Sequence, residues 1–229
     1  MLQTIGWGIL GPGGIAKSFA ADLAKVPDAA LVAVGSRSRR RAEAFAEQFD
    51  VRRAYDDYEA LMADPDVDVI YIATPHPFHH AQAIACLEHG KAVLCEKPLA
   101  VNARQVQEMI DCAAANERFL MEAMWTRFLP VIETVRTWLA AGRIGEVRMM
   151  AADFGFAASW SPDHRLFAPE LAGGALLDVG VYAVALASMV FGGPPQRIRA
   201  AASLGETGVD EQTAMLFAYE GGALAQLFC

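Results

Sequence analysis

The sequence lacks the cysteine patterns that mark disulfide-rich or metal-binding proteins. Its four cysteines stand at positions 86, 95, 112 and 229, and none forms a C-x-x-C pair. The first three lie in apolar patterns, which is typical of reduced, buried thiols in a cytoplasmic protein. We therefore expect neither a disulfide framework nor a metal cluster.

The sequence also lacks an excess of positive charge, with 19 Lys and Arg against 27 Asp and Glu and a formal net charge of -8. Nucleic-acid phosphates are bound by an excess of Lys and Arg, so we expect no nucleic-acid partner. No run approaches the ~20 apolar residues of a membrane span. Residues 1–4 contain neither a basic segment nor a cleavage site, so we expect no secretory signal and a cytoplasmic location.

A glycine-rich loop stands out against this background. The apolar, strand-like segment 3–10 is followed by Gly11-Pro12-Gly13-Gly14-Ile15-Ala16 and a helical pattern to residue 26. This G-x-G-x-x-A arrangement between strand and helix is typical of dinucleotide binding: Gly11 allows the tight turn and Gly13 lets a pyrophosphate approach the backbone. The N–H groups at the helix start, around Gly14 and Ile15, would bind that anion.

The second predicted strand, residues 31–36, ends in Ser36-Arg37-Ser38-Arg39-Arg40-Arg41. NAD-binding proteins carry an Asp or Glu here, which binds the ribose 2′-hydroxyl. A serine hydroxyl and an arginine fork suit a 2′-phosphate instead, so we predict NADP rather than NAD, bound by Ser36, Arg37 and Arg41. A solvated basic helix start is the alternative. However, cations there oppose the helix dipole by ~0.3–1 kcal/mol each, which favours an anionic ligand.

Strand and helix patterns alternate through the first half of the chain, which is typical of a doubly wound, mostly parallel sheet. After the second strand come helix 40–49, short helix 55–63, strand 67–74, helix 78–89, strand Ala92–Cys95, helix 102–116 and strand 119–122. Ligands bind beyond the carboxyl ends of such strands. We therefore predict that Thr74, Pro75, His76 and His79 contact the cofactor. A metal site is the alternative, but the adjacent prolines break i, i+4 ligand spacing, so we predict none.

The apolar strand Ala92–Cys95 ends in Glu96-Lys97-Pro98. Its continuous apolar character indicates burial on both faces. A lysine at this end of a parallel strand points into a ligand site, and Pro98 keeps Lys97 out of helical geometry. An ordinary solvated lysine is the alternative. Sequence alone does not show whether the Lys97-Pro98 bond is cis or trans.

The second half of the chain has a different pattern. Trp125 and Phe128 flank Arg127 in an aromatic segment, and the later segments are helix 129–141, strand 145–156, irregular loop 160–169, a helix from 173 to 191, and strands 196–204, 212–219 and 223–228. Asp178 and Tyr182 are four residues apart, so they share one helix face, and both are costly to bury without partners. They are interpreted as a proton-transfer pair; a tyrosine with a local hydrogen bond is the alternative.

Taken in order, the glycine loop, Glu96-Lys97-Pro98, and Asp178 with Tyr182 after Gly173-Gly174 resemble the glucose–fructose oxidoreductase / inositol dehydrogenase / MocA family. The resemblance covers essentially the whole chain. Within that family, segments 122–128 and 174–182 are similar to those of the dimeric dihydrodiol dehydrogenases and the NADP-dependent D-xylose dehydrogenases.

The resemblance implies an α/β fold, with an N-terminal Rossmann domain over residues 1–122. An α/β domain with an open, mainly antiparallel sheet would follow over residues 123–229. It implies hydride transfer from a secondary alcohol of a cyclic diol or sugar to the nicotinamide, in a homodimer or higher homo-oligomer. The resemblance assigns substrate and ribose contacts to Lys97, acid/base catalysis to Tyr182 with Asp178 beside it, cofactor contact to Glu96, and a substrate pocket to Trp125, Arg127 and Phe154.

Two features depart from the family pattern. His76 stands where the family has an asparagine, and members are longer than this chain, which stops at Cys229 inside the expected antiparallel sheet. A non-catalytic NADP-binding regulator or an inactive truncated member is therefore the alternative to an enzyme, and a purely structural protein is a third reading. The sequence does not choose between diol and sugar substrates or give the direction of the reaction.

Overall fold

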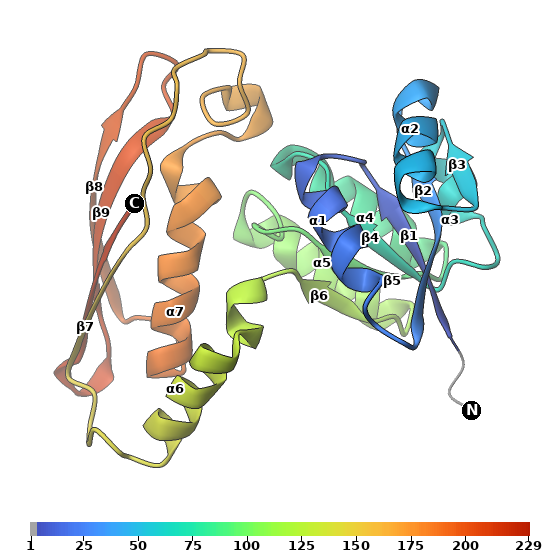
Figure 1. The fold of residues 1–229 in the computed structure, drawn as a ribbon. Coiled ribbons are helices and arrows are strands. Elements are labelled where there is room, and N and C mark those ends of the chain that lie inside the picture. Colours follow the sequence, from blue (N-terminus) through green and yellow to red (C-terminus); the bar gives the residue numbers. More distant parts are fainter. Residues whose placement is uncertain (1–3) are drawn as a thin grey trace. The chain divides into compact units, whose positions relative to one another are not determined.

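The computed structural model describes residues 4–229 and divides the chain into two compact units (Figure 1). Unit 1 is Met1–Ala123 and unit 2 is Met124–Cys229. The strand expected from residue 3 starts within the described residues as β1, Ile5–Leu10; residue 3 itself lies outside them.

Unit 1 is built on a six-stranded sheet in the order β3-β2-β1-β4-β5-β6. Every neighbouring pair in it is parallel. This order is that of the doubly wound dinucleotide-binding sheet, so the predicted fold class is confirmed. The strands after β1 are β2 (Ala29–Gly35), β3 (Arg53–Tyr55), β4 (Val69–Ile72), β5 (Ala92–Cys95) and β6 (Leu120–Glu122).

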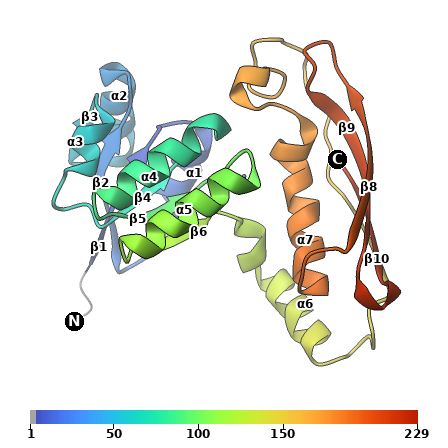
Figure 2. The same ribbon diagram turned by 180° about the vertical axis from the view of Figure 1, so that it is seen from behind.

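Helices cover both faces of this sheet (Figures 1 and 2). Ile9 of β1 packs in the apolar cluster with α1 and α2, whereas its neighbour Leu10 packs in the cluster with α4 and α5. Successive strand residues point to opposite faces, so burial on both faces explains the continuous apolar runs. The helices are α1 (Gly14–Leu23), α2 (Arg39–Phe49), α3 (Tyr58–Met62), α4 (His79–Glu88) and α5 (Ala103–Ala115).

The helix predicted over residues 55–63 is wrong at its start. Residues Arg53–Tyr55 form the edge strand β3, paired with the end of β2, and α3 begins only at Tyr58. The Tyr55 hydroxyl donates to Asp64 Oδ2 at 3.1 Å, and Arg53 Nε lies 2.9 Å from the same oxygen. Pairing with β2 and these contacts outweigh the local helical pattern, because strand formation depends on its neighbours more than on intrinsic preference.

Unit 2 contains a four-stranded sheet in the order β7-β10-β9-β8. The pairs β8–β9 and β9–β10 are antiparallel, whereas β7 and β10 are parallel, so the sheet is mainly antiparallel as expected. Helix α7 packs on one face of this sheet through Ala183 and Ala187 (Figures 1 and 2). The elements are α6 (Pro130–Ala140), β7 (Met149–Asp153), α7 (Val181–Phe191), β8 (Arg197–Leu204), β9 (Asp210–Ala218) and β10 (Leu224–Phe228).

One segment, Pro169–Phe191, is long and apolar enough to cross a membrane by length and composition. The sequence pattern did not single it out, because Asp178 and three glycines interrupt it. Its alanines Ala183 and Ala187 are buried in the core cluster with Phe217 and Leu227 of the sheet. Packing of α7 on the sheet accounts for part of this apolar composition, since 33% of the most apolar window is buried.

Candidate functional site

Of the three glycines in the loop after β1, only Gly11 is required by the fold. The other two leave space that a dinucleotide could use. Gly11 has φ +95°, and an added Cβ would lie 2.8 Å from Thr74 Cγ2. Gly13 has φ −89°, and its added Cβ would meet nothing closer than the Ala73 carbonyl oxygen at 3.9 Å. At Gly14 nothing lies within 4 Å. The space in front of Gly13 and Gly14 is therefore open to a ligand that approaches the backbone, as a pyrophosphate does.

The N-terminus of α1 offers hydrogen-bond donors to such a ligand. Its N-cap residue, Gly13, makes no side-chain cap, and the first turn contains no acidic residue. The first N–H groups of a helix, here those of Gly14, Ile15 and Ala16, have no intrahelical partner. Such groups, together with the positive end of the helix dipole, favour an anionic ligand.

The predicted 2′-phosphate binders differ in exposure. Ser36 is buried, and its Oγ accepts a hydrogen bond from the Ser38 N–H at 3.2 Å. Arg37 is exposed, and its guanidinium lies over the Phe78 ring, 5.6 Å from the centroid. Arg41 is also exposed, in the first turn of α2. The two arginines are thus accessible to an anion at the end of β2, whereas Ser36 serves a local turn.

His79 anchors the loop after β4 through its two ring nitrogens. His79 is fully buried, with Nδ1 2.8 Å from the Pro98 carbonyl oxygen and Nε2 2.8 Å from that of Thr74. Burial lowers the pKa of His79, although both carbonyls and the carboxylates of Glu96 and Glu122 oppose this shift. The buried His79 ring therefore positions the two loops that it joins, and it is not exposed at their surface.

Three further residues of this loop were predicted to contact the cofactor. The Thr74 hydroxyl donates to Gln82 Oε1 at 2.6 Å, so its side chain is directed along the loop. Pro75 precedes the 3-10 turn His76–Phe78. The His76 ring is half-buried and packs against the edge of His79, with centroids 5.8 Å apart. Of the two imidazoles, His76 is therefore the one that reaches the surface.

Lys97 follows β5 in a loop with several side-chain anchors. Glu96 accepts hydrogen bonds from the Tyr71 hydroxyl and, at 3.2 Å, from the Lys97 N–H. The Leu99 N–H donates to Glu122 Oε1 at 2.8 Å, and the Lys97-Pro98 bond is cis. No role was predicted for Glu122. The available signal was its place at the end of β6, the strand that pairs with β5.

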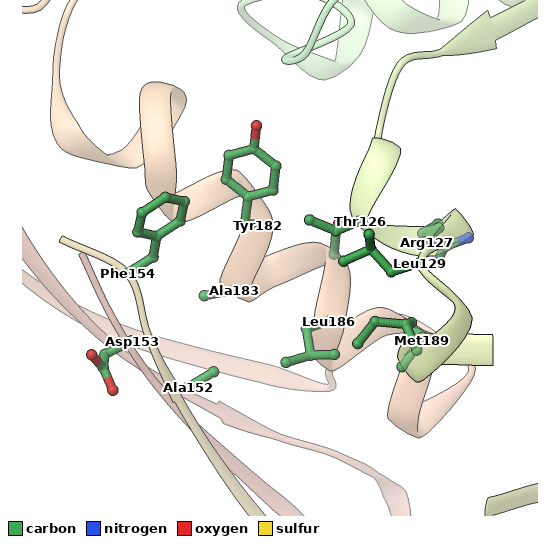
Figure 3. Close-up of a pocket in the computed structure, with 12 residues that line it drawn as sticks. Thr126, Arg127, Leu129, Ala152, Asp153, Phe154, Tyr182, Ala183, Leu186 and Met189 are labelled. Atoms are coloured by element: carbon green, nitrogen blue, oxygen red, sulfur yellow. The ribbon is translucent and has the colours of Figure 1, made fainter. Parts of the chain in front are cut away.

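In unit 2, Tyr182 lies among aromatic side chains. The Trp125 indole N–H donates to the Tyr182 hydroxyl oxygen at 3.0 Å, and the rings of Phe154 and Tyr182 are 5.4 Å apart. A cavity of about 210 Å³ opens beside them (Figure 3). Its walls include Thr126, Arg127, Phe154, Tyr182, Leu186 and Met189. The structure thus brings Arg127 and Phe154, two of the predicted pocket residues, together with Tyr182.

Asp178 lies in a π-helical turn, Leu176–Gly180, which leads directly into the regular helix α7 that carries Tyr182. Asp178 is buried and forms an ion pair with Arg165 at 2.8 Å. The Leu176 N–H donates to Asp210 Oδ2 at 2.8 Å, which caps the turn. Neither Arg165 nor Asp210 was identified from the sequence, because both contacts cross long stretches of chain.

The remaining titratable groups give no metal centre. Among residues 4–229, no group of three or more His, Cys, Asp or Glu side chains is arranged to hold a metal ion. The four cysteines are free thiols, and burial raises the pKa of Cys86 to about 12. Lys97, Glu96 and His79 belong to unit 1, and Asp178, Tyr182 and Trp125 to unit 2.

A doubly wound sheet with an open glycine loop after β1 defines the N-terminal unit as an NAD(P)-binding Rossmann domain. Residues 5–124 match the oxidoreductase family with an NAD-binding Rossmann fold, and residues 132–229 match the GFO/IDH/MocA C-terminal domain. The chain therefore belongs to the GFO/IDH/MocA family of oxidoreductases, which confirms the resemblance seen in the sequence.

Curated relatives and solved structures agree with this assignment. Trans-1,2-dihydrobenzene-1,2-diol dehydrogenase from Mus musculus is 45% identical over 226 residues, covering 97% of this chain and 67% of the relative. An NAD binding oxidoreductase from Klebsiella pneumoniae is 29% identical with a TM-score of 0.87, covering 98% of this chain and 66% of that one. Aldose-aldose oxidoreductase from Caulobacter crescentus, complexed with glycerol, is 26% identical with a TM-score of 0.92, covering 99% and 70%. This chain thus spans about two thirds of their length.

Proposed function

We propose that this chain acts as an NADP-dependent dehydrogenase that oxidises a secondary alcohol of a cyclic diol or sugar. The observation that carries the proposal is the Tyr182 side chain in the wall of the mainly apolar cavity of unit 2, next to Phe154. The mouse relative, 45% identical, is named for a cyclic diol, and the Caulobacter structure for aldoses. When bound, the nicotinamide would accept the hydride.

Preference for NADP is supported by the residues after β2. Arg37 and Arg41 are exposed there, and the first turn of α2 contains no acidic residue that would repel a phosphate. A guanidinium offers a planar fork of donors that matches phosphate oxygens. Contact with the Phe78 ring holds the Arg37 guanidinium in place.

A cyclic substrate is supported by the size and lining of the cavity. Apolar protein cavities of about 150 Å³ bind benzene, so about 210 Å³ has room for one six-membered ring with hydroxyl groups. Phe154 and Leu186 supply apolar walls, and Arg127 and Asp153 are the two charged residues that border the cavity. Trp125 adds an aromatic edge next to Tyr182.

Tyr182 and Lys97 are assigned to proton handling. As the alcohol carbon loses its hydride, the hydroxyl must lose a proton, and a tyrosine can relay it. The Trp125 N–H donates to the Tyr182 oxygen, which fixes the orientation of the phenol. The Lys97 ammonium would favour the developing alkoxide. Asp178, paired with Arg165, would support this chemistry as a fixed carboxylate.

We also propose a homodimer formed through the face of the unit 2 sheet opposite α7. Three large apolar side chains on that face, Met149, Leu216 and Phe228, are 67, 43 and 39% exposed. Exposed apolar patches on sheets mark association surfaces. Light scattering coupled to size-exclusion chromatography measures the oligomeric state directly. A monomer at all concentrations would contradict the proposal.

The first experiment titrates the purified chain with NADPH and NADH and then screens dihydrodiols and pentoses for turnover. We expect tighter NADPH binding, weakened by Arg37→Ala with little change for NADH, and turnover abolished by Lys97→Met. Equal binding of both cofactors would contradict the NADP preference. Cofactor binding without turnover on any polyol would favour a non-catalytic NADP-binding protein.

A further inference from the structure

The loop that carries Lys97 is anchored by side chains from neighbouring strands and helices. The Pro98 carbonyl oxygen lies 2.8 Å from His79 Nδ1 of α4. The Leu99 N–H donates to Glu122 Oε1 of β6 at 2.8 Å. These contacts hold the two residues that follow Lys97. The sheet ladder does not hold them, since β5 ends at Cys95.

We propose that Glu122 is a positioning residue for Lys97, an inference that rests on the proposed function. Glu122 is the last residue of β6 and pairs with Cys95, the last residue of β5. Its half-buried carboxylate thus lies beside the strand end from which the lysine loop departs. A hydrogen bond to a carboxylate is roughly twice as strong as one between neutral groups, so this contact fixes the Leu99 peptide firmly.

His79 is the second anchor of the loop. Its two ring nitrogens lie 2.8 Å from the carbonyl oxygens of Pro98 and Thr74, so the ring joins the lysine loop to the loop after β4. Glu122 thus holds Leu99, and His79 holds Pro98.

Anchoring of this loop affects the reaction rate through the position of Lys97. A displacement of about 1 Å at a group that acts on the reacting atoms can cost about 100-fold in rate. Loss of the Glu122 anchor would lower kcat more than it would raise KM for the cofactor. A residue that only stabilised the fold would lower thermal stability and leave kcat of the folded fraction unchanged.

The experiment compares Glu122→Ala, Glu122→Gln and, as a matched control, Glu47→Ala on the exposed face of α2. We expect Glu122→Ala to lower kcat by about 10- to 100-fold. Glu122→Gln keeps an acceptor oxygen for Leu99 and should stay within about threefold of the wild type. Glu47→Ala should match the wild type.

Hydrogen exchange of the Leu99 amide, measured by NMR, gives a readout that needs no turnover. We expect faster exchange in Glu122→Ala and near wild-type protection in Glu122→Gln. If Glu122→Ala fails to fold, Glu122→Asp, which withdraws the carboxylate by one methylene, should still show faster exchange and a lower kcat.

A folded Glu122→Ala with wild-type kcat would overturn the inference, and so would unchanged Leu99 protection. Loss of activity in Glu122→Gln equal to that in Glu122→Ala would do the same. If the wild type turns over no substrate, the proposed function has failed. The Leu99 exchange rates then decide by themselves whether Glu122 anchors the lysine loop.

Discussion

Replacing each of the two glycines at the turn after β1 by alanine separates cofactor binding from folding. Gly11 and Gly13 are two residues apart, yet the structure requires glycine at Gly11 alone. We expect Gly11→Ala to damage the fold and Gly13→Ala to damage NADPH binding only. The pair therefore tests whether the space before Gly13 is a pyrophosphate site.

The magnitudes follow from the backbone angles and the added Cβ. At Gly11, φ +95° costs a non-glycine residue about 1–2 kcal/mol, and contact at 2.8 Å with Thr74 Cγ2 adds to this. At Gly13, φ −89° suits alanine, and the nearest atom is 3.9 Å away. The free energy of unfolding should change by less than about 1 kcal/mol there, since alanine caps a helix slightly less well but restricts the unfolded chain.

Urea unfolding of the cofactor-free chains gives the stabilities, and NADPH titration gives the affinities. We expect Gly13→Ala to weaken NADPH binding at least about tenfold, which corresponds to about 1.4 kcal/mol. Its urea midpoint should stay close to that of the wild type. Wild-type NADPH affinity in Gly13→Ala would refute the assignment of this loop to the pyrophosphate.

Three further changes test the surroundings of the site. Trp125→Phe keeps an aromatic ring but removes the hydrogen-bond donor to Tyr182, so kcat in steady-state assays should fall about two- to tenfold. An unchanged kcat would show that this hydrogen bond does not contribute to catalysis. Burial lowers the pKa of His79, so the unfolded chain binds that proton more tightly, and the free energy of unfolding should fall as pH drops below about 6.5. His79→Gln should flatten this acid slope in urea titrations. Asp210→Ala removes the acceptor for the Leu176 N–H and should lower stability by about 1–2 kcal/mol; an unchanged urea midpoint would contradict the capping role.

The fold of unit 1 could be predicted because short stretches of consecutive residues indicate each of its main strands. Strands such as Val69–Ile72 and Ala92–Cys95 are buried on both faces, so each is a continuous apolar run bounded by turn residues. The glycine loop likewise carries its signal in six consecutive residues. The edge strand Arg53–Tyr55 was missed because three residues have no periodicity of their own and depend on pairing with β2.

Burial within the candidate site could not be read from residue type. Ser36 and His79 were both predicted to contact the cofactor, and both side chains are buried and bonded to the backbone. A hydroxyl or an imidazole at a strand end can either face a ligand or anchor a loop. Which of the two occurs depends on side-chain direction after the helix has packed, as for His79 on α4.

The contacts that hold the predicted catalytic residues are long-range in both units. Glu122 reaches the lysine loop across 23 residues, and Trp125 reaches Tyr182 across 57. No local pattern encodes such pairs, because each partner takes its place only when its own strand or turn has formed. Lys97 and Tyr182 themselves could be proposed from the sequence because a strand end and a helix give them a fixed local setting. The proposed chemistry is thus visible in short motifs, whereas the contacts around each residue come from partners that are distant in sequence.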